Sequence, residues 1–411
     1  MTSAALAPLR DRKFRYYFLS RLVNLAGTTM APVALAFAVL EVSDSAGALG
    51  LVLAAHSIPQ VAFLLLGGVV ADRFGRTLVI QVSNVGAGIS QALLAVLLLS
   101  GQAEIWHFVA LSAVNGTLSA MSLPALAGVV PALVPREQLQ QANVLISMTR
   151  SGLGIVGPSV AAALVVTAGP GWALLADAAA WIVAAALLSP VRLPARERTG
   201  TVPSMARELA DGWTFFRRTT WLWVVVLAFS ALNGIHAGGF TTLGPVLAKD
   251  SAIGAGGWGL IMSAEAVGLF VMTLLMLRIP LRRPLLWGML GVALFGVPMV
   301  VLGVRPELAW VLPVAFLAGM GIEVFGLGWN LAMQEHVPDE MLSRAYSYDM
   351  LGSYLAIPIG QLTFGPLAAV FGIREVLVAA GVLYLAIALL TLASRSVRDL
   401  QRVSPTAVPA P

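Results

Sequence analysis

The chain has 411 residues, of which 58% are hydrophobic and 11% are charged. Soluble proteins carry roughly 25% charged residues, so this composition argues against two or three soluble domains, which the length alone would suggest. The absence of cysteine excludes disulfides and thiolate metal sites. The net charge of +5 is distributed among loops, so we expect no nucleic-acid partner.

The order of apolar segments predicts an all-α integral membrane protein. The N-terminal stretch "MTSAALAPLRDRKFRYYF" passes from a basic cluster directly into a long apolar span, which is not the pattern of a cleavable signal peptide. A spanning helix needs about 20 apolar residues. Twelve segments meet this requirement, and they begin near Phe14, Leu49, Leu78, Trp106, Val144, Trp172, Trp221, Trp258, Leu285, Leu308, Ala345 and Val376.

The longest polar connection separates the sixth and seventh spans. It reads "VRLPARERTGTVPSMARELADGWTFFRRTT", and its composition predicts a linker with a short amphipathic helix. We therefore predict four parts: a six-helix half at 1–190, a cytoplasmic linker at 191–220, a second six-helix half at 221–396, and a disordered cytoplasmic tail at 397–411.

Basic residues indicate how the spans are oriented. If both termini are cytoplasmic, 20 of the 25 Lys and Arg residues lie on the inner side, whereas only Lys249, Arg305 and Arg374 lie outside. Cytoplasmic loops carry such an excess of basic residues. We therefore expect a multi-pass protein of the inner (cytoplasmic) membrane with both termini inside.

The two halves of the sequence resemble each other. "TTMAPV" returns as "TTLGPV" after 213 residues, "AGALGLVLAAH" as "AGGWGLIMSAE" after 209, and "VPREQLQQA" as "VPDEMLSRA" after 203. The matches keep their order, and their spacing shrinks slowly. Two parallel six-helix repeats are typical of transporters that bind their substrate between the halves, near the middle of the membrane.

A charged stretch interrupts the apolar sequence between the second and third spans. It reads "GGVVADRFGRT" and contains Gly68, Asp72, Arg73, Gly75 and Arg76. Together with twelve spans, a repeat of six and a central linker, it resembles the loop signature of the major facilitator superfamily. The runs "FRYYFLSRLVNLAGTTMAPVALAFAVL" and "LPALAGVVPALVPREQLQQANVL" are most similar to the drug-efflux branch of that superfamily, which includes macrolide and enterobactin exporters.

The resemblance implies a gate at this loop. Asp72 would accept hydrogen bonds at the N-terminus of the eleventh span, where the helix dipole is positive, and Asp349 in that span would meet Arg73 or Arg76. The alternative is topological, because two arginines in a short cytoplasmic turn suffice to anchor it. That alternative leaves Asp72 and the flanking glycines unexplained.

A glycine-rich stretch in the fifth span resembles the motif of the antiporter branch. It reads "GLGIVGP" and contains Gly152, Gly154, Gly157 and Pro158. The resemblance implies a tight, kinked face that prevents leak and favours exchange, whereas the structural alternative is close helix packing. One departure matters: the arginine of the fourth-span motif R-x-x-Q-G is replaced by Ser112, so proton coupling cannot be assumed to follow the usual route.

Ionisable residues within the spans are candidates for function, because they are costly in lipid. Glu265 lies near the middle of the eighth span, and His56 is its counterpart in the repeat. Burial favours a neutral carboxyl, so Glu265 is the main candidate for carrying a proton, with a hydrogen-bonded wall of a wet cavity as the alternative. The other members of this group are Asp177, Arg21, Arg150 and Glu323, and we expect Asp177 to approach Arg150.

Polar residues on spans one, four, seven and ten are candidates for the substrate cavity, because these spans line it in the family. They are Asn24, Thr28, Asn115, Asn233, His236, Glu323 and Asn330. Each of them has the alternative role of holding helices together. The remaining lining is rich in Met, Phe and Trp, which suits a large apolar solute.

These observations predict a secondary active transporter that works by alternating access. The expected activity is proton-coupled efflux of a hydrophobic drug, antibiotic or siderophore-like metabolite. No phosphate-binding loop or zinc-protease motif is present in the sequence, so we expect no enzyme activity, ATP, metal or other cofactor, and we take a monomer as the working assumption. The alternatives are an uptake symporter for a small nutrient and a non-transporting sensor or lipid scramblase.

Overall fold

The computed structural model describes residues 6–402 except 128, 192–212, 277 and 280, and it gives only the backbone of 64, 65, 67–69, 71, 72, 127, 136, 339, 340 and 343. All regular secondary-structure elements among these residues are helices. Twelve helical segments are long and apolar enough to cross a membrane, which confirms the predicted number. Most of the predicted linker and tail lie outside the described residues.

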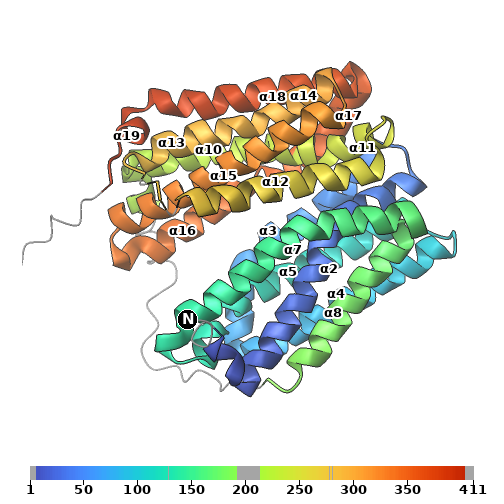
Figure 1. Cartoon of the computed structure of the whole chain (residues 1–411), viewed down its shortest axis with the longest axis horizontal. Helices are drawn as coiled ribbons and strands as arrows, with labels where there is room; N and C mark the ends of the chain where they lie inside the picture. Colours follow the sequence, from blue (N-terminus) through green and yellow to red (C-terminus); the bar gives the residue numbers. More distant parts are fainter. Residues whose placement is uncertain (1–5, 128, 192–212, 277, 280, 403–411) are drawn as a thin grey trace, which may run out of the picture. The chain divides into compact units, whose positions relative to one another are not determined.

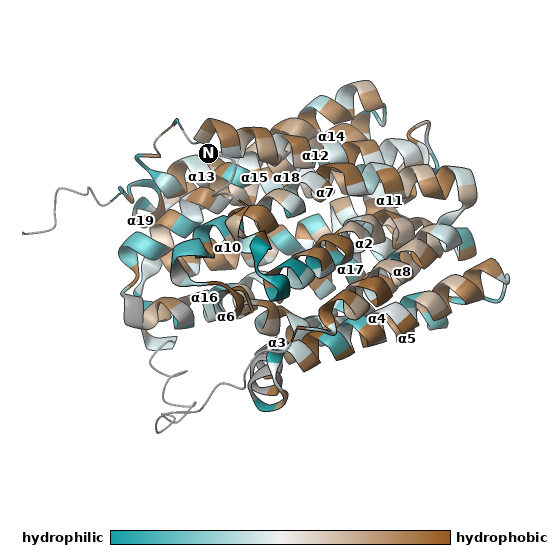
Figure 2. Ribbon diagram, turned by 60° about the horizontal axis from the view of Figure 1, so that its bottom comes forward, coloured by the Kyte–Doolittle hydropathy of each residue, from teal (hydrophilic) through white to brown (hydrophobic). Residues whose placement is uncertain are grey.

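The chain forms two compact units, Met1–Arg198 with Ala248–Ser263 and Thr199–Leu247 with Ala264–Pro411. The first contains the long helices of spans one to six (Figure 1): α2 (Arg12–Val42), α3 (Ala46–Phe74), α4 (Arg76–Leu99), α5 (Ile105–Ala127), α7 (Leu139–Ala168) and α8 (Pro170–Leu188). Short elements η1 (Ala7–Arg10), α6 (Val130–Leu133) and η2 (Arg136–Gln138) accompany them. Hydrophobic residues dominate these helices (Figure 2).

The second unit contains more interrupted helices. They are α10 (Thr220–His236), η3 (Ala237–Leu243), α11 (Gly244–Lys249), α13 (Pro284–Ala293), η4 (Leu294–Gly296), α14 (Val297–Val304), α15 (Leu308–His336), α16 (Asp339–Tyr354), α17 (Ile357–Phe371), α18 (Ile373–Leu390), η5 (Thr391–Ala393) and α19 (Arg395–Arg398). Two helices are divided between the units: α11 has its last two residues, Ala248 and Lys249, in the first unit, and α12 (Gly254–Met276) has its first turns there and the remainder in the second.

Three spans of the second half are broken within the membrane. Span seven changes from α-helix to a π-helix at η3, where the Thr242 hydroxyl donates to the Ala237 carbonyl five residues earlier at 2.8 Å. Pro298 follows the 3₁₀ turn of span nine, and Pro358 follows the break in span eleven. Because proline has no backbone N–H, it removes a helical hydrogen bond, which explains why the two breaks lie there.

A single residue connects α3 to α4 within the charged loop. Gly75 has a φ of +90°, a conformation that a residue with a Cβ atom rarely adopts. The chain therefore passes from α3 to α4 through one residue, without a longer polar loop. Arg76 begins α4 immediately afterwards.

The repeat seen in the sequence returns as a helix crossing in each unit. A methyl group added at Gly116 of α5 would overlap the backbone carbonyl oxygen of His56 in α3, and one added at Gly319 of α15 would overlap that of Glu265 in α12. Small residues allow membrane helices to approach this closely. His56 and Glu265 therefore occupy matching helix crossings.

Candidate functional site

Asp177 of α8 is a fully buried acid in the first unit. Its Oδ2 accepts a hydrogen bond from the Gln91 side chain of α4 at 3.1 Å, while Oδ1 has no partner. Helix α2 passes close to that free oxygen, because a Cβ at Gly27 would lie 2.6 Å from it. Asp177 is thus held by a neutral donor in the packed interior of the unit.

The expected approach of Asp177 to Arg150 is wrong. The side chain of Arg150 is exposed, whereas Asp177 has no exposed surface, and no ion pair joins them. Arg150 instead lies near Arg21 of α2, and the two cations repel each other. Arg21 donates to Asn24 Oδ1 at 2.7 Å. The difference arises because Asp177 points into the helix bundle, a direction that depth along the sequence does not specify.

Asn115 and Thr28, which we predicted to line the cavity, form hydrogen bonds within the first unit. The Asn115 amide donates to Ser90 Oγ on α4 at 2.7 Å, and the Thr28 hydroxyl donates to the Asn24 carbonyl at 3.0 Å. Asn24 is nearly buried, and its amide nitrogen has no partner. Asn115 therefore joins two helices, and Asn24 retains an unused donor.

A cavity of about 240 Å³ lies in the second unit between α10, α15 and α16. Its lining residues are Val225, Phe229, Asn233, Phe325, Trp329, Asp349, Met350, Ser353 and Tyr354. The Phe229 and Phe325 rings stack with centroids 4.0 Å apart. The Asn233 amide donates to the Ser353 carbonyl at 2.9 Å. Aromatic walls with a few fixed polar groups are typical of small-molecule sites.

Asp349 is the acidic group of this cavity. Its carboxylate oxygens accept from the Trp329 indole at 2.9 Å and from the Ser353 hydroxyl at 3.1 Å. Both donors are neutral, so they orient the carboxylate without cancelling its charge. The predicted contact of Asp349 with Arg73 or Arg76 stays a prediction.

Glu323 and Asn330 of α15 both make side-chain hydrogen bonds. Glu323 Oε1 accepts from the Thr273 hydroxyl of α12 at 2.8 Å. Asn330 donates to the Gly326 carbonyl at 2.8 Å and accepts from the Tyr346 hydroxyl at 3.2 Å. Both residues therefore hold helices of the second unit together.

Glu265 lies halfway along α12, eleven residues from Gly254 and from Met276. At 1.5 Å per residue this is ~16 Å from either end, which is the middle of a hydrocarbon core about 30 Å thick. Its carboxyl interacts electrostatically with Tyr384 of α18, and it forms no hydrogen bond with another described residue.

His236 ends α10 immediately before the π-helix. Its ring lies 4.6 Å from that of Phe295 and 5.3 Å from that of Phe240, and its Nε2 is buried without a partner. Phe295 in turn approaches Tyr384 at 6.2 Å. His236 thus packs in a cluster with Phe240 and Phe295, and Phe295 connects this cluster to Tyr384, with which Glu265 interacts electrostatically.

The structure gives less detail for the charged loop between α3 and α4 than for the glycine-rich motif of α7. Only the backbone of Gly68 and Asp72 is described, while Arg73 is exposed over the Phe74 ring. In the glycine-rich motif of α7, a Cβ at Gly157 would lie 2.6 Å from the Thr29 Cβ, whereas one at Gly152 or Gly154 would meet nothing within 4 Å. Among the three glycines of this motif, close packing is therefore confined to Gly157, while the Pro158 carbonyl lies against Gly259 of α12.

A comparison with known families decides the class of the protein. The sequence model described as "Major Facilitator Superfamily" matches residues 17–361, which is most of the chain. The chain belongs to the major facilitator superfamily. It is a multi-pass membrane transporter of small molecules and not an enzyme.

Curated relatives of this facilitator are exporters. "Macrolide efflux protein A" of Streptococcus pyogenes is 24% identical over 406 residues, covering 94% of this chain and 97% of the relative. "Enterobactin exporter EntS" of Shigella boydii is 26% identical over 360 residues, covering 87% and 85%. The predicted resemblance to the efflux branch is confirmed, although both identities are low.

Solved structures share the facilitator fold. A bacterial homologue of the human lysosomal transporter Spinster superposes with a TM-score of 0.75 at 15% identity, over 97% of this chain and 99% of the other. The nucleoside transporter NupG gives a TM-score of 0.72 at 12% identity, over 93% and 98%. At these identities the likeness concerns the fold alone.

The sequence of this facilitator does not reveal the partners of its buried acids. Gln91, Thr273, Trp329 and Ser353 are common residues in apolar helices, and nothing in their sequence context marks them as donors. The π-helix was also missed. The pair Gly238 and Gly239 ahead of Pro245 was the available signal, since such breaks in membrane spans often accompany glycine and proline.

Proposed function

We propose that this facilitator exports a hydrophobic drug, antibiotic or siderophore-like metabolite in exchange for protons, with Glu265 as the proton-carrying group. The observation that carries the proposal is the placement of Glu265. Its carboxyl lies at mid-membrane depth in α12, with no recorded hydrogen bond among the described residues. A carboxyl without a fixed donor can accept and release a proton as its surroundings change.

The internal repeat supports the same assignment. His56 and Glu265 occupy equivalent crossings, each closed by a glycine of the facing helix. Titratable groups inside membrane spans commonly mark proton pathways. We therefore include His56 as a second proton-binding candidate, in the first unit.

The cavity of the second unit supports a hydrophobic cargo. The rings of Phe229, Phe325 and Trp329 form its walls, and Asn233 and Asp349 supply its polar groups. The efflux relatives support export as the direction. Asn24, with its unpartnered amide, is the residue of the first half that we propose to contact cargo.

The gate remains part of the proposal on sequence grounds. We propose that Gly68, Asp72, Arg73, Gly75, Arg76 and Asp349 form the cytoplasmic latch. The tight turn at Gly75 supports this role, because it fixes the end of α3 against the start of α4. Both termini are proposed to be cytoplasmic.

The decisive experiment measures transport in proteoliposomes against a panel of hydrophobic compounds, with and without an imposed pH gradient. We expect Glu265→Gln to bind compounds with little change and to lose gradient-driven transport at least tenfold, because glutamine permanently mimics the neutral carboxyl. Glu323→Gln is the matched control, since Thr273 already holds that carboxyl. Full gradient-driven efflux by Glu265→Gln would exclude Glu265, and inward accumulation by the unmodified protein would indicate an uptake symporter.

A further inference from the structure

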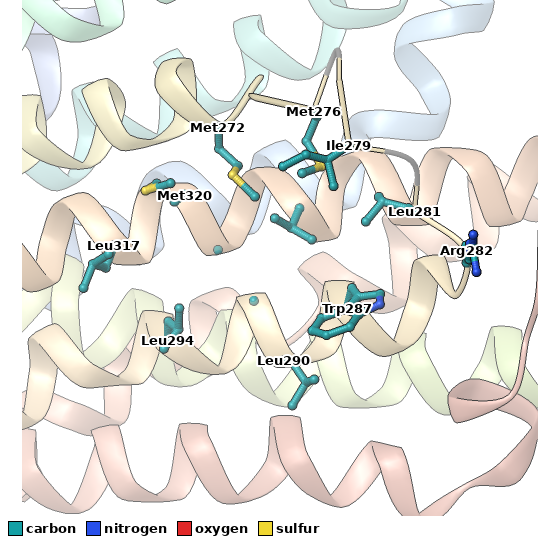
Figure 3. Close-up of a pocket in the computed structure, with 13 residues that line it drawn as sticks. Met272, Met276, Ile279, Leu281, Arg282, Trp287, Leu290, Leu294, Leu317 and Met320 are labelled. Carbon is teal, nitrogen blue, oxygen red and sulfur yellow. The ribbon is translucent and has the colours of Figure 1, made fainter. Parts of the chain in front are cut away.

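An apolar groove of about 610 Å³ runs along the second unit between α12, α13 and α15 (Figure 3). It is lined by Met272, Met276, Ile279, Leu281, Arg282, Trp287, Leu290, Gly291, Leu294, Leu317, Met320, Gly321 and Val324. Arg282 is the only charged residue in this set. None of the residues belongs to the cavity around Asp349, so the groove is a separate feature.

The groove has a charged end and an apolar end. Figure 3 shows Arg282 at one end, beside the start of α13, and Leu294 and Leu317 at the other. From Pro284 to Leu294 the helix rises through ten residues, which is ~15 Å. That length is about half of the hydrocarbon thickness of a bilayer, so the groove extends through the depth of one leaflet.

The apolar walls are open and adaptable. Trp287, Leu294 and Leu317 are 54%, 42% and 47% exposed, and methionine side chains reach in from α12 and α15. Unbranched thioether side chains fit irregular apolar ligands. A flexible hydrocarbon chain matches these walls better than a rigid ring system does.

The arginine at the charged end has no acidic partner among the described residues. Arg282 is exposed, and only its backbone carbonyl is bonded, by the Arg402 amide at 3.1 Å. The nearby acids are already engaged: Asp399 pairs with Arg283 at 3.8 Å and with Arg398 at 3.4 Å, and Glu335 pairs with Arg402 at 2.9 Å. The charge of Arg282 is thus available to an anion at the mouth of the groove.

We propose that this groove binds a phospholipid with a net negative headgroup, its acyl chain along the apolar walls and its phosphate on Arg282. An acyl chain that spans one leaflet needs an apolar groove of that length. The phosphate of the headgroup needs a cation at one end of the groove, and Arg282 supplies it. Basic residues beside the cytoplasmic ends of membrane helices attract anionic lipids. The basic loop that contains Arg282 is on the side for which the charge bias predicts a cytoplasmic location.

The test is native mass spectrometry of the purified full-length protein, titrated with phosphatidylglycerol or phosphatidylcholine of identical acyl chains. We expect the unmodified protein to retain phosphatidylglycerol at least fivefold more strongly. Arg282→Gln should abolish that preference and leave the backbone contact with Arg402 in place. Arg283→Gln is the matched control, because it removes an adjacent charge of the same kind that already has a partner.

A second variant tests the acyl-chain part of the site. Leu294→Trp should reduce the binding of both lipids by filling the apolar end. No preference for phosphatidylglycerol, or equal losses in Arg282→Gln and Arg283→Gln, would overturn the proposal. Displacement of lipid by uncharged hydrophobic compounds, equally in the unmodified protein and in Arg282→Gln, would instead identify a cargo site and overturn it as well.

Discussion

At the scale of single residues, three buried or partly buried acids of this facilitator are held by neutral donors. Gln91 donates to Asp177, Thr273 to Glu323, and both Trp329 and Ser353 to Asp349. Such bonds fix the direction of a carboxyl group without neutralising its charge. Glu265 differs, since its carboxyl has no hydrogen-bond donor among the described residues and interacts electrostatically with Tyr384. Because of this contrast, we propose Glu265, and not the other three acids, as the proton carrier.

The bond between Gln91 and Asp177 gives a prediction about stability. Asp177→Leu leaves the buried Gln91 amide without its acceptor, so we expect the free energy of unfolding to fall by about 1–3 kcal/mol. Asp177→Asn keeps a carbonyl oxygen that accepts the same hydrogen bond, so its loss should be smaller. Thermal unfolding in detergent measures both variants, and equal losses would show that the bond does not stabilise the fold.

At the scale of helices, glycine determines how closely neighbouring spans approach. Gly116 and Gly319 bring two helices of their own unit into backbone contact at matching places. Gly321 and Gly328 of α15 also meet the backbone of a neighbouring helix, whereas Gly326 of the same helix has no neighbour within 4 Å. The composition of a span therefore does not reveal which of its glycines is required.

Two glycines of α15 should respond differently to the same substitution. Gly319→Ala places a methyl group against the backbone of Glu265, which no side-chain movement relieves, so we expect about 1–3 kcal/mol of destabilisation from overpacking. Gly326→Ala meets open space and should be neutral or slightly stabilising. The apparent unfolding temperature and the folded yield measure this difference. A Gly326→Ala protein as unstable as Gly319→Ala would contradict the assigned crossing.

At the scale of the whole molecule, the twelve spans and their loops determine which residues face each side of the membrane. The charge bias places 102 and 251 outside and 137 and 394 inside. Because the chain contains no cysteine, single cysteines can report each position without background.

The topology prediction follows from that bias. A membrane-impermeant maleimide should label Gln102→Cys and Ser251→Cys on intact cells, and should label Glu137→Cys and Ser394→Cys only after permeabilisation. Each variant must first be shown to reach the membrane at normal abundance. Labelling of Glu137→Cys on intact cells would reverse the proposed orientation.

The number of spans, the repeat and the family could all be predicted from the sequence. The twelve predicted starts lie within five residues of the observed ones, with the largest difference at Leu139, which was predicted at Val144. The starts could be predicted because a segment that spans the bilayer must be apolar over about 20 residues, whereas the loops carry charge. Both properties can be read from consecutive residues. The order of the spans then follows from connectivity.

The tertiary structure alone decided what each intramembrane polar group contacts. Asp177 meets Gln91, which lies 86 residues away, and not Arg150, which the sequence had suggested. The π-helix, the aromatic cavity and the groove ending at Arg282 likewise depend on side chains from different helices. Hydropathy fixes how deep a residue lies in the membrane, but its direction around the helix axis depends on which neighbouring helix packs against it.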